Sequence, residues 1–214
     1  MTRIALIHAL AHSVAPVNEA MAAGWPLAAR MNLLDDSLST DLARAGGLDD
    51  AMHDRFRRLA AYAVDCGCDA ILFTCSAFGP CIEAVARANP GVPVLKPNEA
   101  MVAEAAAAGG RIGLVASFAP TLATMPAEFP AGTDLVTGLA EGALQALDAG
   151  DAARHDALVA SAARRLVDQG CTRIALAQFS LARARDVVQQ ACGVPVLTTV
   201  HSAVAELRRR LRAR

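Results

Sequence analysis

The chain has 214 residues, of which 54% are hydrophobic and 19% are charged, and its formal net charge is −1. The near-neutral charge gives no electrostatic basis for binding nucleic acid or a membrane surface, and no stretch is long and apolar enough to predict a transmembrane helix. The length predicts one large or two small globular domains.

Short apolar segments alternate with longer amphipathic ones along the chain, which is typical of an α/β fold with parallel sheets. In the first part, strands are predicted at 3–8, 30–34, 69–74 and 92–95, and helices near 15–23, 49–66, 79–88 and 98–108. In the second part, strands are predicted at 111–116, 133–137, 172–177 and 194–197, and helices near 119–127, 139–169 with a break at Gly150, 181–191 and 200–213. Ligands of such sheets bind outside the carboxyl ends of the strands.

Three blocks of the first part return in the same order in the second part, which indicates an internal repeat. RIAL at 3–6 returns as RIGL at 111–114, VDCGC at 64–68 returns as VDQGC at 167–171, and GVPVL at 91–95 returns unchanged at 193–197. The predicted fold class is therefore α/β, with two homologous parallel-sheet, flavodoxin-like halves. Each half has three α/β/α layers, and a pseudo-two-fold axis relates the two.

The first half is predicted to comprise 1–98 plus the C-terminal helix 200–214, and the second half 99–199. If the halves face each other, their strand ends meet at a shared cleft, where we expect the active site.

Six cysteines are spread along the chain: Cys66, Cys68, Cys75, Cys81, Cys171 and Cys192. Their density is too low for a disulfide scaffold, and their spacings match no common zinc pattern. We therefore predict reduced thiols, no bound metal and a cytoplasmic location.

The stretch ILFTCSAFGP at 71–80 ends an apolar strand at Cys75 and opens a helix at Gly79 and Pro80. Free backbone N–H groups and the helix dipole at such a turn favour an anion and a thiolate. We expect Cys75 to be a catalytic base or nucleophile with a lowered pKa, beside a small-carboxylate site. The alternative is an inert core cysteine.

The repeat pairs the turn of the first half with a similar turn of the second. Cys75 matches Gln178, Ser76 matches Phe179, and Ala77 matches Ser180. His8 ends the first strand, while Ser117 and Thr121 follow the equivalent strand of the second half. We expect Ser76, Ala77 and the N–H groups at 76–79 to hold a carboxylate, with Ser117, Thr121 and Phe179 as substrate-binding residues of the second half. Helix capping is the structural alternative for the hydroxyls.

The fused halves, the Thr-Cys-Ser turn at 74–76 and the GVPVL blocks together resemble the aspartate/glutamate/hydantoin racemase superfamily over nearly the whole chain. Its relatives include arylmalonate decarboxylase and maleate isomerase. The resemblance implies a cofactor-independent enzyme in which one cysteine from each half faces opposite sides of the substrate α-carbon. Cys75 stands at the first cysteine position, but Gln178 stands at the second. A homodimer is a further expectation of the resemblance.

An amide cannot act as a general base, so a symmetric two-thiol mechanism is in doubt. A racemase or epimerase of a small carboxylate, such as an Asp/Glu-type amino acid or a hydantoin, would pair Cys75 with another donor, for which His8, Ser180 and His201 are candidates. A decarboxylase or isomerase of an activated dicarboxylate needs only one cysteine. A non-catalytic small-carboxylate-binding protein is the third interpretation. Gln178, counted with Cys75, Ser180 and His8 among the candidate catalytic-site residues, can hydrogen-bond a substrate amide or carboxylate, and a satisfied amide at a strand end is the structural alternative.

Other residues are weaker candidates for a role in the site. Lys96 can neutralise a second carboxylate, whereas His53 and His155 are expected on the surface and Cys81 in a packing role. Gly109 and Gly110 precede a strand, whereas a dinucleotide-binding turn follows one, so a nucleotide enzyme is rejected.

Overall fold

The computed structural model describes residues 1–212, and residues 213 and 214 of the predicted closing helix lie outside the described residues. The chain divides into two compact units: Met1–Pro97 together with the last helix from Ala203 onwards, and Asn98–Ser202. Each unit contains one four-stranded parallel sheet with flanking helices, so the predicted α/β class with two parallel sheets is confirmed. Among the described residues, none of the helices has the length and apolar character that a bilayer crossing requires.

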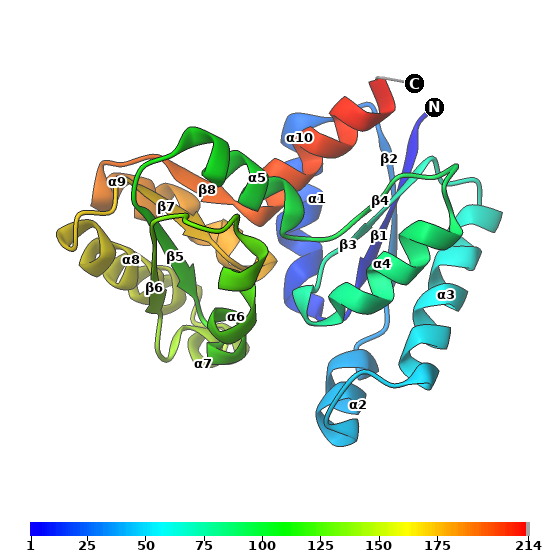
Figure 1. The fold of residues 1–214 in the computed structure, drawn as a ribbon, viewed down its shortest axis with the longest axis horizontal. Coiled ribbons are helices and arrows are strands. Elements are labelled where there is room, and N and C mark those ends of the chain that lie inside the picture. Colours follow the sequence, from blue (N-terminus) through cyan, green and yellow to red (C-terminus); the bar gives the residue numbers. More distant parts are fainter. Residues whose placement is uncertain (213–214) are drawn as a thin grey trace. The chain divides into compact units, whose positions relative to one another are not determined.

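The sheet of the first unit has the strand order β2-β1-β3-β4 (Figure 1). Its strands are β1 (Arg3–His8), β2 (Ala29–Leu34), β3 (Ala70–Phe73) and β4 (Val94–Leu95). Its helices are η1 (Ala11–Ser13), α1 (Val14–Gly24), α2 (Ser37–Ala45), α3 (Asp50–Asp65), η2 (Ser76–Phe78), α4 (Gly79–Ala88) and the end of α10 (Thr199–Arg212).

Both faces of the central strands β1 and β3 are buried, as expected for a parallel sheet covered by crossover helices. Ala5 and Ile7 of β1 belong to an apolar cluster formed with residues of α2, α3 and α4. Ile4 and Leu6, which alternate with them, point to the opposite face and are also fully buried. The alternation explains why β1 is an uninterrupted apolar run in the sequence.

The second unit repeats the strand order as β6-β5-β7-β8. Its strands are β5 (Ile112–Ala116), β6 (Leu135–Leu139), β7 (Arg173–Leu176) and β8 (Val196–Thr198). Its helices are α5 (Glu99–Ala108), α6 (Ala119–Thr124), η3 (Met125–Glu128), α7 (Ala143–Asp148), α8 (Ala152–Asp168), η4 (Phe179–Ala184), α9 (Arg185–Cys192) and the start of α10.

Two separate apolar clusters cover the two faces of the second sheet. One joins Val115 and Ile174 to α8 and α9, and the other joins Leu114 and Ala175 to α5 and η3. Gly113 of the central strand β5 leaves no space for a larger side chain, because an added Cβ would lie within 3.0 Å of side chains that cover the strand. Close packing in this unit therefore depends on small residues.

The predicted strands match the observed ones within two residues at each end. The predicted long helix at 139–169 is two helices, α7 and α8, and the break falls at Gly150, whose φ of 77° lies in the left-handed region that favours glycine. The sequence analysis missed α2 entirely. The apolar stripe of α2 consists of the buried Leu38 and the partly buried Leu42, one turn apart in a helix of nine residues, so the periodic pattern is too short to stand out.

Candidate active site

Cys75 lies at the carboxyl edge of the first sheet, two residues after β3 ends. Its backbone is extended, with φ −125° and ψ 122°, and η2 and α4 follow, with Pro80 in the first turn of α4. The connections after β1 and β3 run in opposite directions, because β2 lies beyond β1 and β4 lies beyond β3. Cys75 therefore sits at the topological switch point of the sheet, the usual place for a ligand in open α/β folds.

The thiol of Cys75 is partly buried among apolar side chains, and this desolvation raises its pKa. The backbone N–H of Ala77 donates to the sulfur and lowers the pKa, but only in partial compensation. The expected lowered pKa of Cys75 is therefore wrong for the protein without a ligand. The group is therefore a protonated thiol around neutral pH.

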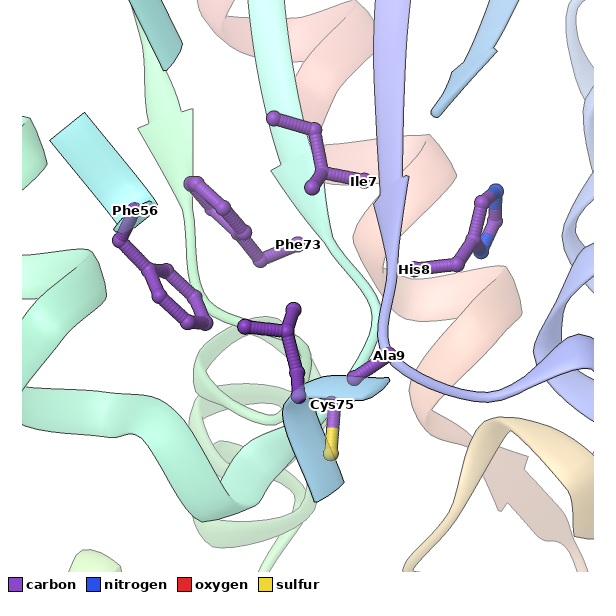
Figure 2. A pocket seen from close by; sticks show the side chains of 7 residues that line it. Ile7, His8, Ala9, Phe56, Phe73 and Cys75 are labelled. Atoms are coloured by element: carbon purple, nitrogen blue, oxygen red, sulfur yellow. The ribbon is translucent and has the colours of Figure 1, made fainter. Parts of the chain in front are cut away.

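A small apolar pocket adjoins the thiol. It is lined by Ile7, His8, Ala9, Leu38, Phe56, Phe73 and Cys75 (Figure 2). The ring of Phe56, from α3, stacks on Phe73 with centroids 5.2 Å apart, and Leu38 of α2 completes the apolar wall. None of the lining side chains is an aspartate, glutamate, lysine or arginine, so the thiol has apolar packing and no charged neighbour on this side.

The imidazole of His8 lies on the other side of the strands from Phe56 and Phe73 (Figure 2). It is fully buried, and its Nδ1 and Nε2 lie 3.0 Å from Thr74 Oγ1 and 3.0 Å from Asn32 Oδ1. Because an amide oxygen only accepts, Nε2 carries the proton and Nδ1 accepts from the Thr74 hydroxyl. Burial lowers the pKa of His8, and the bond to Asn32 offsets this only in part. His8 is thus a neutral ring that anchors the residue preceding Cys75.

The second unit places Gln178 and Ser117 together at the equivalent position of its own sheet. Gln178 follows β7 and Ser117 follows β5, the two central strands. The backbone N–H and the hydroxyl of Ser117 both donate to Gln178 Oε1, at 2.7 Å and 3.1 Å. The side-chain oxygen of Gln178 therefore occupies the donors that we expected to hold a carboxylate.

Thr121, Phe179 and Ser180 lie in the same two segments of the chain, which follow β5 and β7. Phe179 is buried in η4. Thr121 and Ser180 are 7% and 8% exposed, and neither hydroxyl has a hydrogen-bond partner within residues 1–212. Neither oxygen is among the enclosed polar atoms that lack a partner, so each keeps a small solvent-accessible surface.

The remaining candidates lie outside these two groups or are already engaged. Lys96 Nζ lies 2.7 Å from Glu83 Oε1, so its charge is neutralised within the first unit. His201 is exposed, and its Nδ1 lies 2.6 Å from Thr198 Oγ1 at the end of β8. Cys81 is buried in the apolar cluster, which confirms its packing role.

The prediction that His155 lies on the surface is wrong, because its side chain is fully buried. Its Nδ1 lies 2.7 Å from Asp156 Oδ1, and Arg183 pairs with the same carboxylate. These three groups join α8 to η4.

Each unit thus brings together its own sequence-predicted residues: Cys75, Ser76 and Ala77 in the first, and Gln178, Ser117, Ser180 and Thr121 in the second. The sequence analysis missed Leu38, Phe56 and Asn32. Of these three residues, only Asn32 could have been noticed in the sequence, because it is a polar residue inside the predicted strand at 30–34. Within the described residues, no cluster of three or more His, Cys, Asp and Glu side chains forms a metal site.

The model of the Asp/Glu/Hydantoin racemase family matches residues 40–207, which is most of the chain. This chain belongs to that family. No curated protein sequence matches it.

Solved structures of the racemase family share the fold. The allantoin racemase of Klebsiella pneumoniae matches with a TM-score of 0.72 and 16% identity over 100% of this chain and 89% of its own. The glutamate racemase of Thermus thermophilus in complex with Beta-chloro-D-alanine matches with a TM-score of 0.70 and 20% identity, over 99% and 81% of the two chains. A putative Asp/Glu racemase from Yersinia pestis matches with a TM-score of 0.66 and 14% identity, over 99% and 100%. At these identities the likeness shows a common fold.

Proposed function

We propose that this protein is a cofactor-independent racemase or epimerase of a small carboxylate of the Asp/Glu or hydantoin type, and that Cys75 transfers the proton at the α-carbon. The position of Cys75 at the switch point of the first sheet carries the proposal. Membership of the Asp/Glu/Hydantoin racemase family supports it, as do the glutamate and allantoin racemases that share the fold.

In the proposed reaction Cys75 first releases its thiol proton to solvent, and the thiolate sulfur then takes the α-proton of the substrate. The C–H bond breaks, an S–H bond forms, and the electron pair passes into the adjacent carboxyl or carbonyl group as an enolate. The N–H of Ala77 stabilises the thiolate form, which burial disfavours. Reprotonation of the enolate on the other face then gives the opposite configuration.

The substrate carboxylate binds Ser76 and the backbone N–H groups that open η2 and α4 in this proposal. Ser76 is half-buried, and its hydroxyl has no hydrogen-bond partner in the part of the chain that the structure describes. His8 is assigned a positioning role, because both ring nitrogens are engaged by Thr74 and Asn32.

A decarboxylase that uses one cysteine is the second candidate, and two observations favour it. Gln178 stands where the repeat and the family resemblance place a second cysteine, and the raised pKa keeps Cys75 as a thiol. In a decarboxylation the C–C bond to the departing CO₂ breaks and leaves an enolate. The thiol proton of Cys75 then goes to carbon, so one acid suffices.

Proton NMR in D₂O distinguishes these functions. The protein is incubated with aspartate, glutamate, hydantoins and substituted malonates, beside Cys75→Ala and, as the matched control, Cys81→Ala. We expect deuterium to enter the α-position with loss of optical purity, in the wild type and the Cys81 variant and not in Cys75→Ala. Release of CO₂ from a malonate would instead establish the decarboxylase. Binding without exchange or decarboxylation would refute both and leave a non-catalytic carboxylate-binding protein.

A further inference from the structure

In the turn after β5, the backbone N–H and the hydroxyl of Ser117, which could bind an anion, are already occupied. Such a turn offers its backbone N–H and a hydroxyl, and in this protein both groups belong to Ser117. Both donate to Gln178 Oε1, at 2.7 Å and 3.1 Å, so an internal amide oxygen takes the place of an external carboxylate oxygen. The two bonds also fix the direction of the Gln178 side chain across the ends of the two central strands.

This arrangement leaves the amide nitrogen of Gln178 available. Its Nε2 has two N–H donors and no hydrogen-bond partner among residues 1–212, and the side chain is only partly buried. The hydroxyls of Thr121 and Ser180, each on a side chain more than nine-tenths buried, also have no partner in the described chain. Three polar groups without a partner thus lie in the segments that follow the two central strands of the second sheet, β5 and β7.

All three groups are uncharged. Residues 117–121 carry no charge, and Arg183, the first cation after Gln178 in sequence, is paired with Asp156. Arg185 is exposed near His201, beyond η4. A carboxylate taken out of water needs a cation or several strong donors to compensate its desolvation, whereas a carbonyl oxygen needs only one or two hydrogen bonds. The amide nitrogen and the two hydroxyls therefore match an uncharged carbonyl group better than a second carboxylate.

We infer that Gln178, positioned by Ser117, is a specificity-determining residue that binds an uncharged carbonyl of the ligand, such as a carboxamide or ureido carbonyl, and discriminates against diacids. The inference rests on the proposed function for the general class of substrate, a small carboxylate, and narrows that class to acids that carry an uncharged carbonyl in place of a second carboxylate.

Binding at Gln178 can be followed directly by NMR, through the resonances of its side-chain amide group. In ¹⁵N-labelled protein its Nε2–H₂ resonances are assigned by their loss in Gln178→Met, and are then followed during titration with asparagine against aspartate and glutamine against glutamate. We expect the resonances to shift with the amides at concentrations about tenfold below those that the diacids require. Gln178→Met should weaken amide binding about tenfold and leave diacid binding unchanged.

Gln189 supplies a matched control, because its Oε1 accepts from the N–H of Val196, 3.1 Å away, in the same unit. Gln189→Met should leave both affinities unchanged. Ser117→Ala should shift the Gln178 resonances of the free protein and abolish the amide preference, and Ser117→Thr should restore both. A merely structural role for Ser117 would not produce that restored preference.

Equal responses to amides and diacids, or no response of Gln178 to either, would overturn the inference. Because the titration requires no turnover, its result is separate from that of the proposed function. If Gln178 responds while no α-proton exchanges, the inference stands and the proposed function fails. If exchange depends on Cys75 but Gln178 does not respond, only the inference fails.

Discussion

Arg55 of α3 pairs with Asp41 of α2 beside the Cys75 pocket. The variant Arg55→Met therefore tests whether α2 covers the thiol of Cys75. The guanidinium of Arg55 lies 2.5 Å from Asp35 and 2.6 Å from Asp41, and it also donates to Ser37 Oγ at 2.6 Å. Leu38, which lies on α2, is 1% exposed and lines the pocket. Leu38 and the Arg55 pairs therefore hold α2 over the pocket.

The side chains of Arg55, Asp35 and Asp41 are 29%, 27% and 36% exposed, so solvent screens both ion pairs in part. Each pair is then worth about 0.5–1 kcal/mol, and loss of both costs about 1–2 kcal/mol. Since 1.4 kcal/mol is a factor of ten in an equilibrium, the population with α2 displaced should rise about 5- to 30-fold. Methionine keeps the apolar stem of the side chain, which limits the change to the charged group.

The assay is the rate at which iodoacetamide modifies Cys75, followed by peptide mass spectrometry to separate it from the other five cysteines. We expect Arg55→Met to raise this rate about 5- to 30-fold at constant pH. Arg57→Met is the control, because Arg57 lies on the same helix and pairs with Asp54 on an exposed face. It should leave the rate unchanged. Equal rates in the two variants and the wild type would show that α2 does not cover Cys75.

The same pairs predict a pH dependence. Burial by itself raises the pKa of Asp35, but hydrogen bonds from Ser37 and Arg55 outweigh it, so the net pKa is lowered. A lowered pKa in the folded state contributes stability above the unfolded value, which is about 4. This contribution is lost as the pH falls through the folded pKa. The difference in urea stability between the wild type and Arg55→Met should therefore shrink below about pH 4, and a constant difference down to pH 2 would contradict the assignment.

Three further predictions concern stability. Gly113→Ala should lower the free energy of urea unfolding by about 1–3 kcal/mol, because the added methyl group has no space. The control Gly91→Ala should be neutral, because a methyl group there meets nothing within 4 Å. Similar costs for the two variants would refute the packing argument. Thr74→Val should cost about 1–3 kcal/mol, because it leaves Nδ1 of buried His8 without a partner, and a neutral result would mean that another donor reaches the ring. Arg209 and Arg210 lower the pKa of Glu206 to about 2, so Glu206→Gln should destabilise the protein above the ordinary carboxyl pKa and have no effect below about pH 2; an NMR titration that gives an ordinary pKa for Glu206 would contradict this.

The strands could be predicted closely because their signal is local. In β1 and β3 nearly every side chain is buried, so each reads as a short apolar run. Gly150 marked the break between α7 and α8 because its left-handed backbone favours glycine. By contrast, α2 has one buried leucine, and its position depends on Arg55 of another helix. Leu38 and Leu42 give this nine-residue helix a periodic pattern of a single turn, which is too short to be distinguished from a loop.

The sequence by itself determined the α/β class, the family and the place of Cys75 at a strand end, because apolar periodicity, turn residues and repeated motifs are all written along the chain. Only the tertiary structure decided that burial raises the pKa of Cys75, and that His155 lies inside rather than on the surface. Only it showed Ser117 donating to Gln178, a residue 61 positions away. Desolvation and hydrogen bonding depend on the neighbours that a side chain meets after folding, and those neighbours come from distant parts of the chain.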